Sequence, residues 1–277
     1  KAHHEALNTL RVALDSGEGF IRVTGEVGTG KTMLCRKLMD ELPDHERAVY
    51  IPNPHLMPSM LRVAVARELG LEVDARQDQN QILNRIHARL IEMARRGYRV
   101  IVCLDEAQAM PDETLEALRL LTNLETQRRK LLHVVLFGQP ELLDKLAKPE
   151  LRQVRQRIAW SYHLTPYDRE DVAAYVAHRL AVAGYRRRRL FSRWAVYVLW
   201  RASGGVPRVV NILAHKSLMR GYGRGASRIG ARDVRAAAAE TDGATRPTLA
   251  PLRATVYALG VVVLGLGLWA LWAGASA

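Results

Sequence analysis

The stretch Gly25-Glu26-Val27-Gly28-Thr29-Gly30-Lys31-Thr32 follows an apolar segment, 20–24, that is typical of a strand, and opens a segment, 31–41, that is typical of a helix. Glycines adopt positive φ at little cost, so successive backbone N–H groups can turn toward one anion. The helix adds its N-terminal partial positive charge. We therefore expect a phosphate-binding loop of the G-x-x-x-x-G-K-[ST] type, in which Lys31 contacts the β- and γ-phosphates of ATP and the Thr32 hydroxyl binds Mg²⁺.

Two carboxylates follow the apolar segment RVIVCL at residues 99–104, which is typical of a buried strand. They are Asp105 and Glu106. A strand beside the phosphate-binding loop would place Asp105 near the metal ion, and Glu106 where a base can polarise the attacking water. The sequence therefore predicts Asp105 as a metal ligand together with Thr32, and Glu106 as a catalytic residue.

Two further positions have residues suited to catalysis. Gln139 follows another buried segment and could help to orient water at the γ-phosphate; a plain turn residue before proline is the alternative. Arg157 directly precedes the last predicted strand, a place from which a basic residue can reach a nucleotide bound to a neighbouring subunit. Arg155 and Arg152 compete with it for this role, and a solvated basic face is the remaining alternative.

Apolar periodicity alternates between strand and helix over residues 10–164, which indicates an α/β fold with a parallel sheet covered on both faces. From residue 168 to residue 240 every periodic segment is typical of a helix. Arg208 opens one of these helices and could contact the γ-phosphate. We therefore predict a nucleotide-binding domain at residues 1–164, a helical domain at 165–240 and a linker at 241–254.

The formal net charge of +13 is concentrated in one part of the chain. Residues 1–150 carry a net charge of −1, residues 151–246 carry +13, and residues 247–277 carry +1. A basic excess of this kind favours an anionic partner, which could be DNA or anionic lipid. The run Arg186–Arg189 fits either partner, or is a solvated loop. Two cysteines are too few for a disulfide-stapled secreted scaffold.

The last part of the sequence is apolar, with VYALGVVVLGLGLWALWA at residues 256–273. A helix of this length spans about 27 Å, close to the thickness of the hydrocarbon core of a bilayer. Arg246 and Arg253 precede the segment and no charged residue follows it, so the positive-inside rule places the body of the protein in the cytoplasm. We expect one transmembrane helix at residues 255–274, in the inner membrane of a bacterium.

Several segments together resemble one known family. They are GEVGTGKT at 25–32, LDEAQ at 104–108, LRLLTNLET at 118–126, FGQPEL at 137–142, LRQVRQRI at 151–158 and SGGVPRVVN at 203–211. Over about residues 3–240 the chain resembles the AAA+ ATPases of the ExeA/GspA type, which serve general secretion, and their MshM relatives, which serve MSHA pilus biogenesis.

This resemblance implies a P-loop ASCE sheet with strand order 5-1-4-3-2, followed by a helical lid. It implies Walker A for the glycine-rich loop and Walker B for Asp105 and Glu106. It also implies sensor 1 for Gln139, the arginine finger for Arg157 and sensor 2 for Arg208. Glutamine departs from the Asn or Thr that is frequent at sensor 1 in the wider superfamily.

The predicted function is that of a membrane-anchored, Mg²⁺-dependent ATP hydrolase that works as a homo-oligomer. It would support the assembly of a secretion or type IV (MSHA-like) pilus machine, with an inner-membrane protein of that machine as its partner. One alternative is a DNA-binding accessory ATPase of the transposition-helper type, which the basic region favours. Another is an ATP-binding scaffold that rarely hydrolyses its nucleotide.

Overall fold

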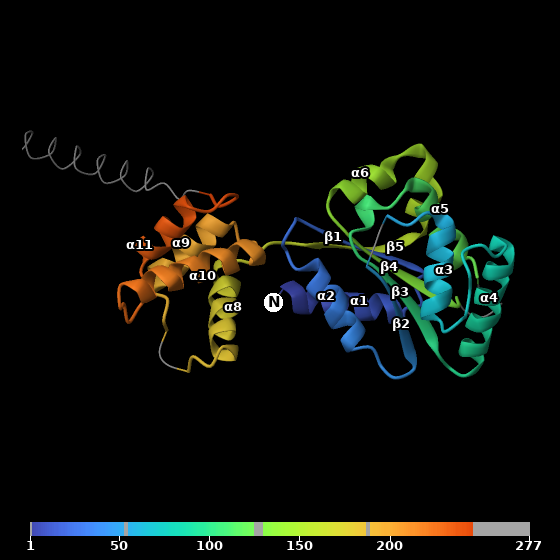
Figure 1. The fold of residues 1–277 in the computed structure, drawn as a ribbon, viewed down its shortest axis with the longest axis horizontal. Helices are drawn as coiled ribbons and strands as arrows, with labels where there is room; N and C mark the ends of the chain where they lie inside the picture. Colours follow the sequence, from blue (N-terminus) through green and yellow to red (C-terminus); the bar gives the residue numbers. More distant parts are fainter. Residues whose placement is uncertain (1, 53–54, 125–129, 187–188, 246–277) are drawn as a thin grey trace, which may run out of the picture. The chain divides into compact units, whose positions relative to one another are not determined.

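The structure, a computed structural model, describes residues 2–52, 55–124, 130–186 and 189–245 (Figure 1). The described residues form two compact units. The first unit extends to Tyr167 and includes Val206–Arg208, and the second contains Asp168–Gly205 and the described residues from Val209 onward. The elements of the first unit are α1 (Ala2–Asp15), β1 (Phe20–Gly25), α2 (Lys31–Asp40), β2 (Glu46–Ile51), α3 (Pro58–Glu68), α4 (Gln79–Arg95), β3 (Arg99–Leu104), η1 (Ala107–Ala109), α5 (Asp112–Thr122), β4 (Leu132–Gly138), α6 (Glu141–Ala147), η2 (Pro149–Leu151), α7 (Arg152–Arg157) and β5 (Ile158–Leu164).

Parallel strands of the described chain form one five-stranded sheet in the order β2-β3-β4-β1-β5. This is the order that the family resemblance implied. The strands β3 and β4 lie inside the sheet and are buried almost throughout, which explains their continuous apolar sequences. The strand β5 forms one edge, and its residues alternate between intermediate burial and exposure until Leu164.

Alternate residues of the central strands pack into two separate cores. Val100, Val102 and Leu104 of β3 contribute to a core with α3, α4 and α5, whereas Ile101 and Cys103 contribute to a core with α1 and α2. Figure 1 shows α1 and α2 together on one side of the strands, and α3, α4 and α5 together on the other. The sheet is therefore covered on both faces, as the sequence predicted.

The helix α1 was not expected from the sequence. Its buried residues recur at helical spacing and pack against the central strands: Ala6, Leu7, Leu10, Ala13 and Leu14. The chain then turns through Gly17 into β1. The short helices α6 and α7, between β4 and β5, were likewise not predicted.

The second unit contains α8 (Arg169–Val182), α9 (Arg193–Ser203), most of α10 (Pro207–Gly223) and α11 (Ala231–Ala239). As the sequence predicted, the long elements described in this region are all helices. The side chain of Asp168 accepts a hydrogen bond from the Asp171 N–H at 2.7 Å and caps α8, and Ser192 caps α9 in the same way. Both residues lie directly before the first residue of the helix that they cap.

The structure contradicts the predicted location, a single pass through the inner membrane, so this prediction is wrong. Within the described ranges, no helix is both long and apolar enough to cross a membrane. The longest helices there, α4 and α10, have 17 residues each, which is about 25 Å, and both contain charged residues. The transmembrane helix expected at residues 255–274, and most of the linker expected before it, lie outside the described residues.

Candidate active site

The carboxyl ends of β1, β3 and β4 meet at one edge of the sheet and bring the predicted polar residues together. The loop from Gly25 to Lys31 joins β1 to α2. Gly28 and Gly30 have φ angles of 81° and 99°, in a backbone region that residues other than glycine rarely adopt. Gly30 is also the residue directly before α2. The loop therefore has the backbone of a phosphate cradle at a helix N-terminus.

The loop holds Lys31 in a fixed place. Its Nζ donates hydrogen bonds to the carbonyl oxygens of Gly25 at 2.8 Å and Glu26 at 3.0 Å, and the residue is only 4% exposed. Burial lowers the pKa of Lys31, and the negative charges of Glu106 and Asp105 oppose this shift. The two hydrogen bonds therefore keep the side chain of Lys31 at the loop, where the charges of both carboxylates act on it. Thr29 closes the loop by donating from both its N–H and its hydroxyl to the Glu26 carbonyl.

Thr32 and Asp105 are in direct contact. The Thr32 hydroxyl donates to Asp105 Oδ2 at 2.6 Å, and Asp105 Oδ1 accepts from the Glu106 N–H at 3.0 Å. Hydroxyl and carboxylate oxygens are ligands that Mg²⁺ prefers. Among the described residues there is no cluster of three or more His, Cys, Asp and Glu side chains that could hold a metal. The donor set fits an ion that takes few protein ligands and completes its shell with phosphate and water, as Mg²⁺ does.

Glu106 has an unusual backbone. Its φ angle is 53°, and in the described part of the chain it is the one residue other than glycine with positive φ. Its Oε2 accepts hydrogen bonds from Gln108 Nε2 at 2.6 Å and from Gln139 Nε2 at 2.9 Å. Burial acts to raise the pKa of Glu106, but these hydrogen bonds and the charge of Lys31 outweigh it and lower that pKa. The site keeps this carboxylate ionised and oriented.

Gln108 is a site residue that the sequence prediction missed. It lies on the η1 turn and touches both other polar groups: its Nε2 donates to Glu106, and its Oε1 accepts from the Gln139 N–H at 3.0 Å. Lys145 of α6 fixes this turn by donating to the Gln108 carbonyl at 3.0 Å. The segment LDEAQ contained the signal, because a polar residue two positions after Glu106 can return to it across a tight turn.

The basic residues are placed differently. Arg152, Arg155 and Arg157 all lie on α7 and are exposed. None of the three side chains forms a hydrogen bond or ion pair with any residue that the structure describes. Arg208 is exposed as well, and its N–H donates to the Gly28 carbonyl at 3.2 Å within the first unit. The structure thus brings Arg208 to the loop and leaves the α7 arginines on the surface.

The N-terminal helix also reaches the loop. His3 Nε2 lies 2.8 Å from the Thr29 carbonyl oxygen, and the His3 ring packs edge-on against Tyr167 with 5.2 Å between ring centroids. His3 therefore ties α1 to the Gly25–Thr32 loop at Thr29.

A glycine-rich loop before a helix, carboxylates after the neighbouring strand and a polar residue after the next strand together define a P-loop nucleotide-binding domain. A model of the AAA domain family matches residues 13–146, a range that contains all three features. Residues 13–146 are therefore an AAA domain.

A more specific relationship comes from a curated protein. The chain is 43% identical over 241 residues to general secretion pathway protein A of Aeromonas hydrophila. The match covers 87% of this chain and 44% of that protein. The resemblance to the ExeA/GspA type is thereby confirmed, and the chain spans less than half the length of this relative.

Solved structures agree on the fold. The chain resembles Cdc6p of Pyrobaculum aerophilum with a TM-score of 0.66 at 19% identity, covering 86% of this chain and 66% of that one. It resembles the ORC2 protein of Aeropyrum pernix, solved in ADPNP–ADP complexes, with a TM-score of 0.62 at 17% identity, covering 90% and 68%. For the RuvB branch migration motor of Thermotoga maritima the TM-score is 0.57 at 17% identity, covering 85% and 67%. At such identities the likeness concerns the fold alone.

Proposed function

We propose that this chain binds ATP together with Mg²⁺ at the Gly25–Thr32 loop and hydrolyses it. The observation that carries the proposal is the position of Glu106, whose carboxylate is held by Gln108 and Gln139 beside the Thr32–Asp105 pair. Glu106 has a backbone conformation that is usually found at glycine. Such strained conformations cluster at functional sites, which supports a role for the Glu106 side chain beyond packing.

In this proposal each residue has a defined task. Lys31 donates to phosphate oxygens, and Thr32 and Asp105 hold Mg²⁺, which would neutralise charge on the β- and γ-phosphates. Glu106 accepts a proton from a water molecule while the water oxygen bonds to the γ-phosphorus. The bond from that phosphorus to the bridging oxygen breaks, and ADP and phosphate are released. The lowered pKa of Glu106 keeps it in the ionised form that can accept the proton.

The test separates binding from chemistry. Glu106→Gln should keep ATP affinity and lower kcat by about 10²–10⁴-fold, the usual contribution of a general base. Lys31→Ala should lose both ATP binding and turnover. Glu68→Gln, at an exposed position of α3, is the matched control and should behave as wild type. A Glu106→Gln protein with wild-type turnover would refute the assignment of the base.

We further propose that the ATPase works as a homo-oligomer and supports the assembly of secretion machinery, with a protein of that machinery as its partner. The name of the Aeromonas hydrophila relative supports this context, and assembly of a related type IV pilus is the neighbouring possibility. The exposed α7 arginines support self-association, because Arg157 could then act on a neighbour's nucleotide. An ATPase rate measured with and without the partner would distinguish this ATPase from an ATP-binding scaffold.

A DNA-binding accessory ATPase is the second candidate. The observation in its favour is the net charge of +13 on residues 151–246. Among solved structures with this fold, the ORC1 protein of Aeropyrum pernix was determined in complex with DNA. This function requires ATP-dependent binding to duplex DNA that weakens steeply as salt rises. Titration of labelled duplex at several salt concentrations, with and without ATP, decides between the two.

A further inference from the structure

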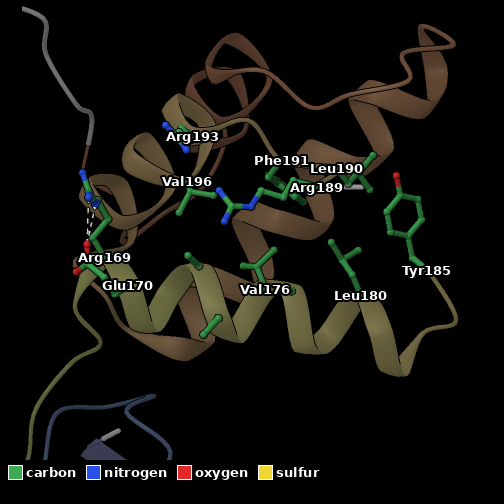
Figure 2. Close-up of a pocket in the computed structure, with 13 residues that line it drawn as sticks. Arg169, Glu170, Val176, Leu180, Tyr185, Arg189, Leu190, Phe191, Arg193 and Val196 are labelled. Atoms are coloured by element: carbon green, nitrogen blue, oxygen red, sulfur yellow. Dashed lines mark hydrogen bonds and ion pairs between the residues drawn. The ribbon is translucent and has the colours of Figure 1, made fainter. Parts of the chain in front are cut away.

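A groove of about 650 Å³ runs along α8 within the second unit (Figure 2). Val176 and Leu180 of α8 line one side, and Leu190, Phe191 and Val196 line the other. Figure 2 shows these two sets of side chains facing each other across the groove. Phe191 and Val176 are almost fully buried, at 4% and 6% exposure, and belong to the floor. The groove is therefore mainly apolar.

The groove is elongated in the direction of α8. The lining residues of this helix recur at helical spacing from Arg169 to Leu180, a rise of about 16 Å. Ala173 and Ala177 are exposed on this face, and their small side chains leave the space above the helix open. A groove of this form suits consecutive side chains of a peptide segment better than a compact ligand.

Arginine side chains lie at the edge of the groove, beside its apolar floor. Arg169 is paired with Glu170 at 3.0 Å, whereas Arg189 and Arg193 have no ion pair with any described residue. In Figure 2 the Arg189 side chain extends over the groove between Val176 and Val196. Guanidinium groups bind carboxylates through two parallel hydrogen bonds. The edge of the groove is therefore complementary to Asp or Glu side chains.

We propose that this groove binds an acidic amphipathic segment of a partner protein, one that inserts apolar side chains and pairs flanking carboxylates with Arg189 and Arg193. A nucleic acid backbone would satisfy the arginines but would leave Leu180, Leu190 and Val196 without an apolar partner. A partner that is only apolar would leave the guanidinium groups unpaired beside it. The combination of both surfaces points to the peptide. The proposal goes beyond ATP hydrolysis and does not depend on it.

The test uses the full chain and a fluorescein-labelled peptide of about 16 residues, with leucine on one helical face and glutamate on the other. We expect a saturable rise in fluorescence anisotropy. Replacing the glutamates of the peptide by lysine, or its leucines by serine, should weaken binding by about tenfold or more. No saturable binding of the original peptide would overturn the proposal.

Matched variants locate the site. Ala177→Glu puts a carboxylate inside the groove, whereas Ala181→Glu makes the same change one turn further along α8 and outside the lining. Arg193→Glu and Arg179→Glu form a second pair, since Arg179 is exposed on α8 but does not line the groove. All four positions are exposed, so the variants should fold. The groove variants should weaken binding about tenfold, and the outside variants less than about twofold.

Three other results would overturn the proposal. Equal loss in the groove and outside variants would mean attraction to net charge alone. If the peptide does not bind, and duplex DNA binds the wild type but not Ala177→Glu, the groove would be a nucleic acid site. If the peptide does not bind, and Ala177→Glu abolishes self-association in analytical ultracentrifugation, the groove would be an interface between copies of this chain.

Discussion

Replacing Gln108 by methionine would remove two hydrogen bonds while keeping the length of the side chain. One is the 2.6 Å bond from Gln108 Nε2 to Glu106 Oε2, and the other is the 3.0 Å bond that Gln108 Oε1 accepts from the Gln139 N–H. A hydrogen bond to a charged group contributes about 1.5–3 kcal/mol. If this energy orients the base, its loss should lower kcat by about 10–100-fold.

The pH dependence gives the change a second signature. The hydrogen bond from Gln108 stabilises the ionised form of Glu106 and so lowers the pKa of this carboxyl. Without that bond the pKa of Glu106 rises, and a higher pH is needed to keep the base ionised. The acidic limb of the kcat profile should therefore move to higher pH in Gln108→Met, while ATP affinity stays unchanged.

The assay is steady-state ATPase activity across pH, combined with direct titration of ATP binding. Gln81→Met, at an exposed position of α4, is the matched control and should leave the profile in place. A normal kcat with an unmoved acidic limb would show that Gln108 does not position Glu106. Equal loss of ATP affinity and turnover would show that the substitution damages the loop instead.

Three other predictions concern assembly and folding. Arg157→Ala should lower turnover by about 10³–10⁵-fold and abolish a steep rise of specific activity with protein concentration; a flat concentration dependence in the wild type would contradict a trans arginine. Leu10→Ala in α1 should cost about 2–5 kcal/mol in urea unfolding because Leu10 is buried, whereas Val12→Ala, at 56% exposure, should cost far less. Asp78→Ala should cost about 1 kcal/mol, since the Asp78 carboxylate caps α4 through the N–H groups of Asn80 and Gln81; unchanged stability would discount this cap.

Much of the fold could be predicted because its signals are local. The strands β3 and β4 are continuous apolar segments with clear ends, and the caps Asp168 and Ser192 mark helix starts in the second unit. The sequence also carries a signal for α1, namely apolar residues at helical spacing before Phe20.

The candidate site was only partly predictable. The phosphate-binding loop and the carboxylates after β3 follow from short motifs with a known geometry. The bond between Gln108 and Gln139 joins residues 31 positions apart, and it forms only because β3 and β4 are neighbours in the sheet. The left-handed backbone at Glu106, which turns its side chain toward both glutamines, has no signature in composition or periodicity.

At Glu106, the backbone conformation lowers stability, while the proposed activity requires the glutamate side chain. A residue other than glycine held at φ 53° costs about 1–2 kcal/mol relative to glycine there. Glycine at position 106 would therefore relieve the strain, yet it would remove the carboxylate that the proposed chemistry requires. On the proposed mechanism, a screen for thermal stability alone would select an inactive protein at this position. Stabilising screens of this chain should therefore hold position 106 fixed.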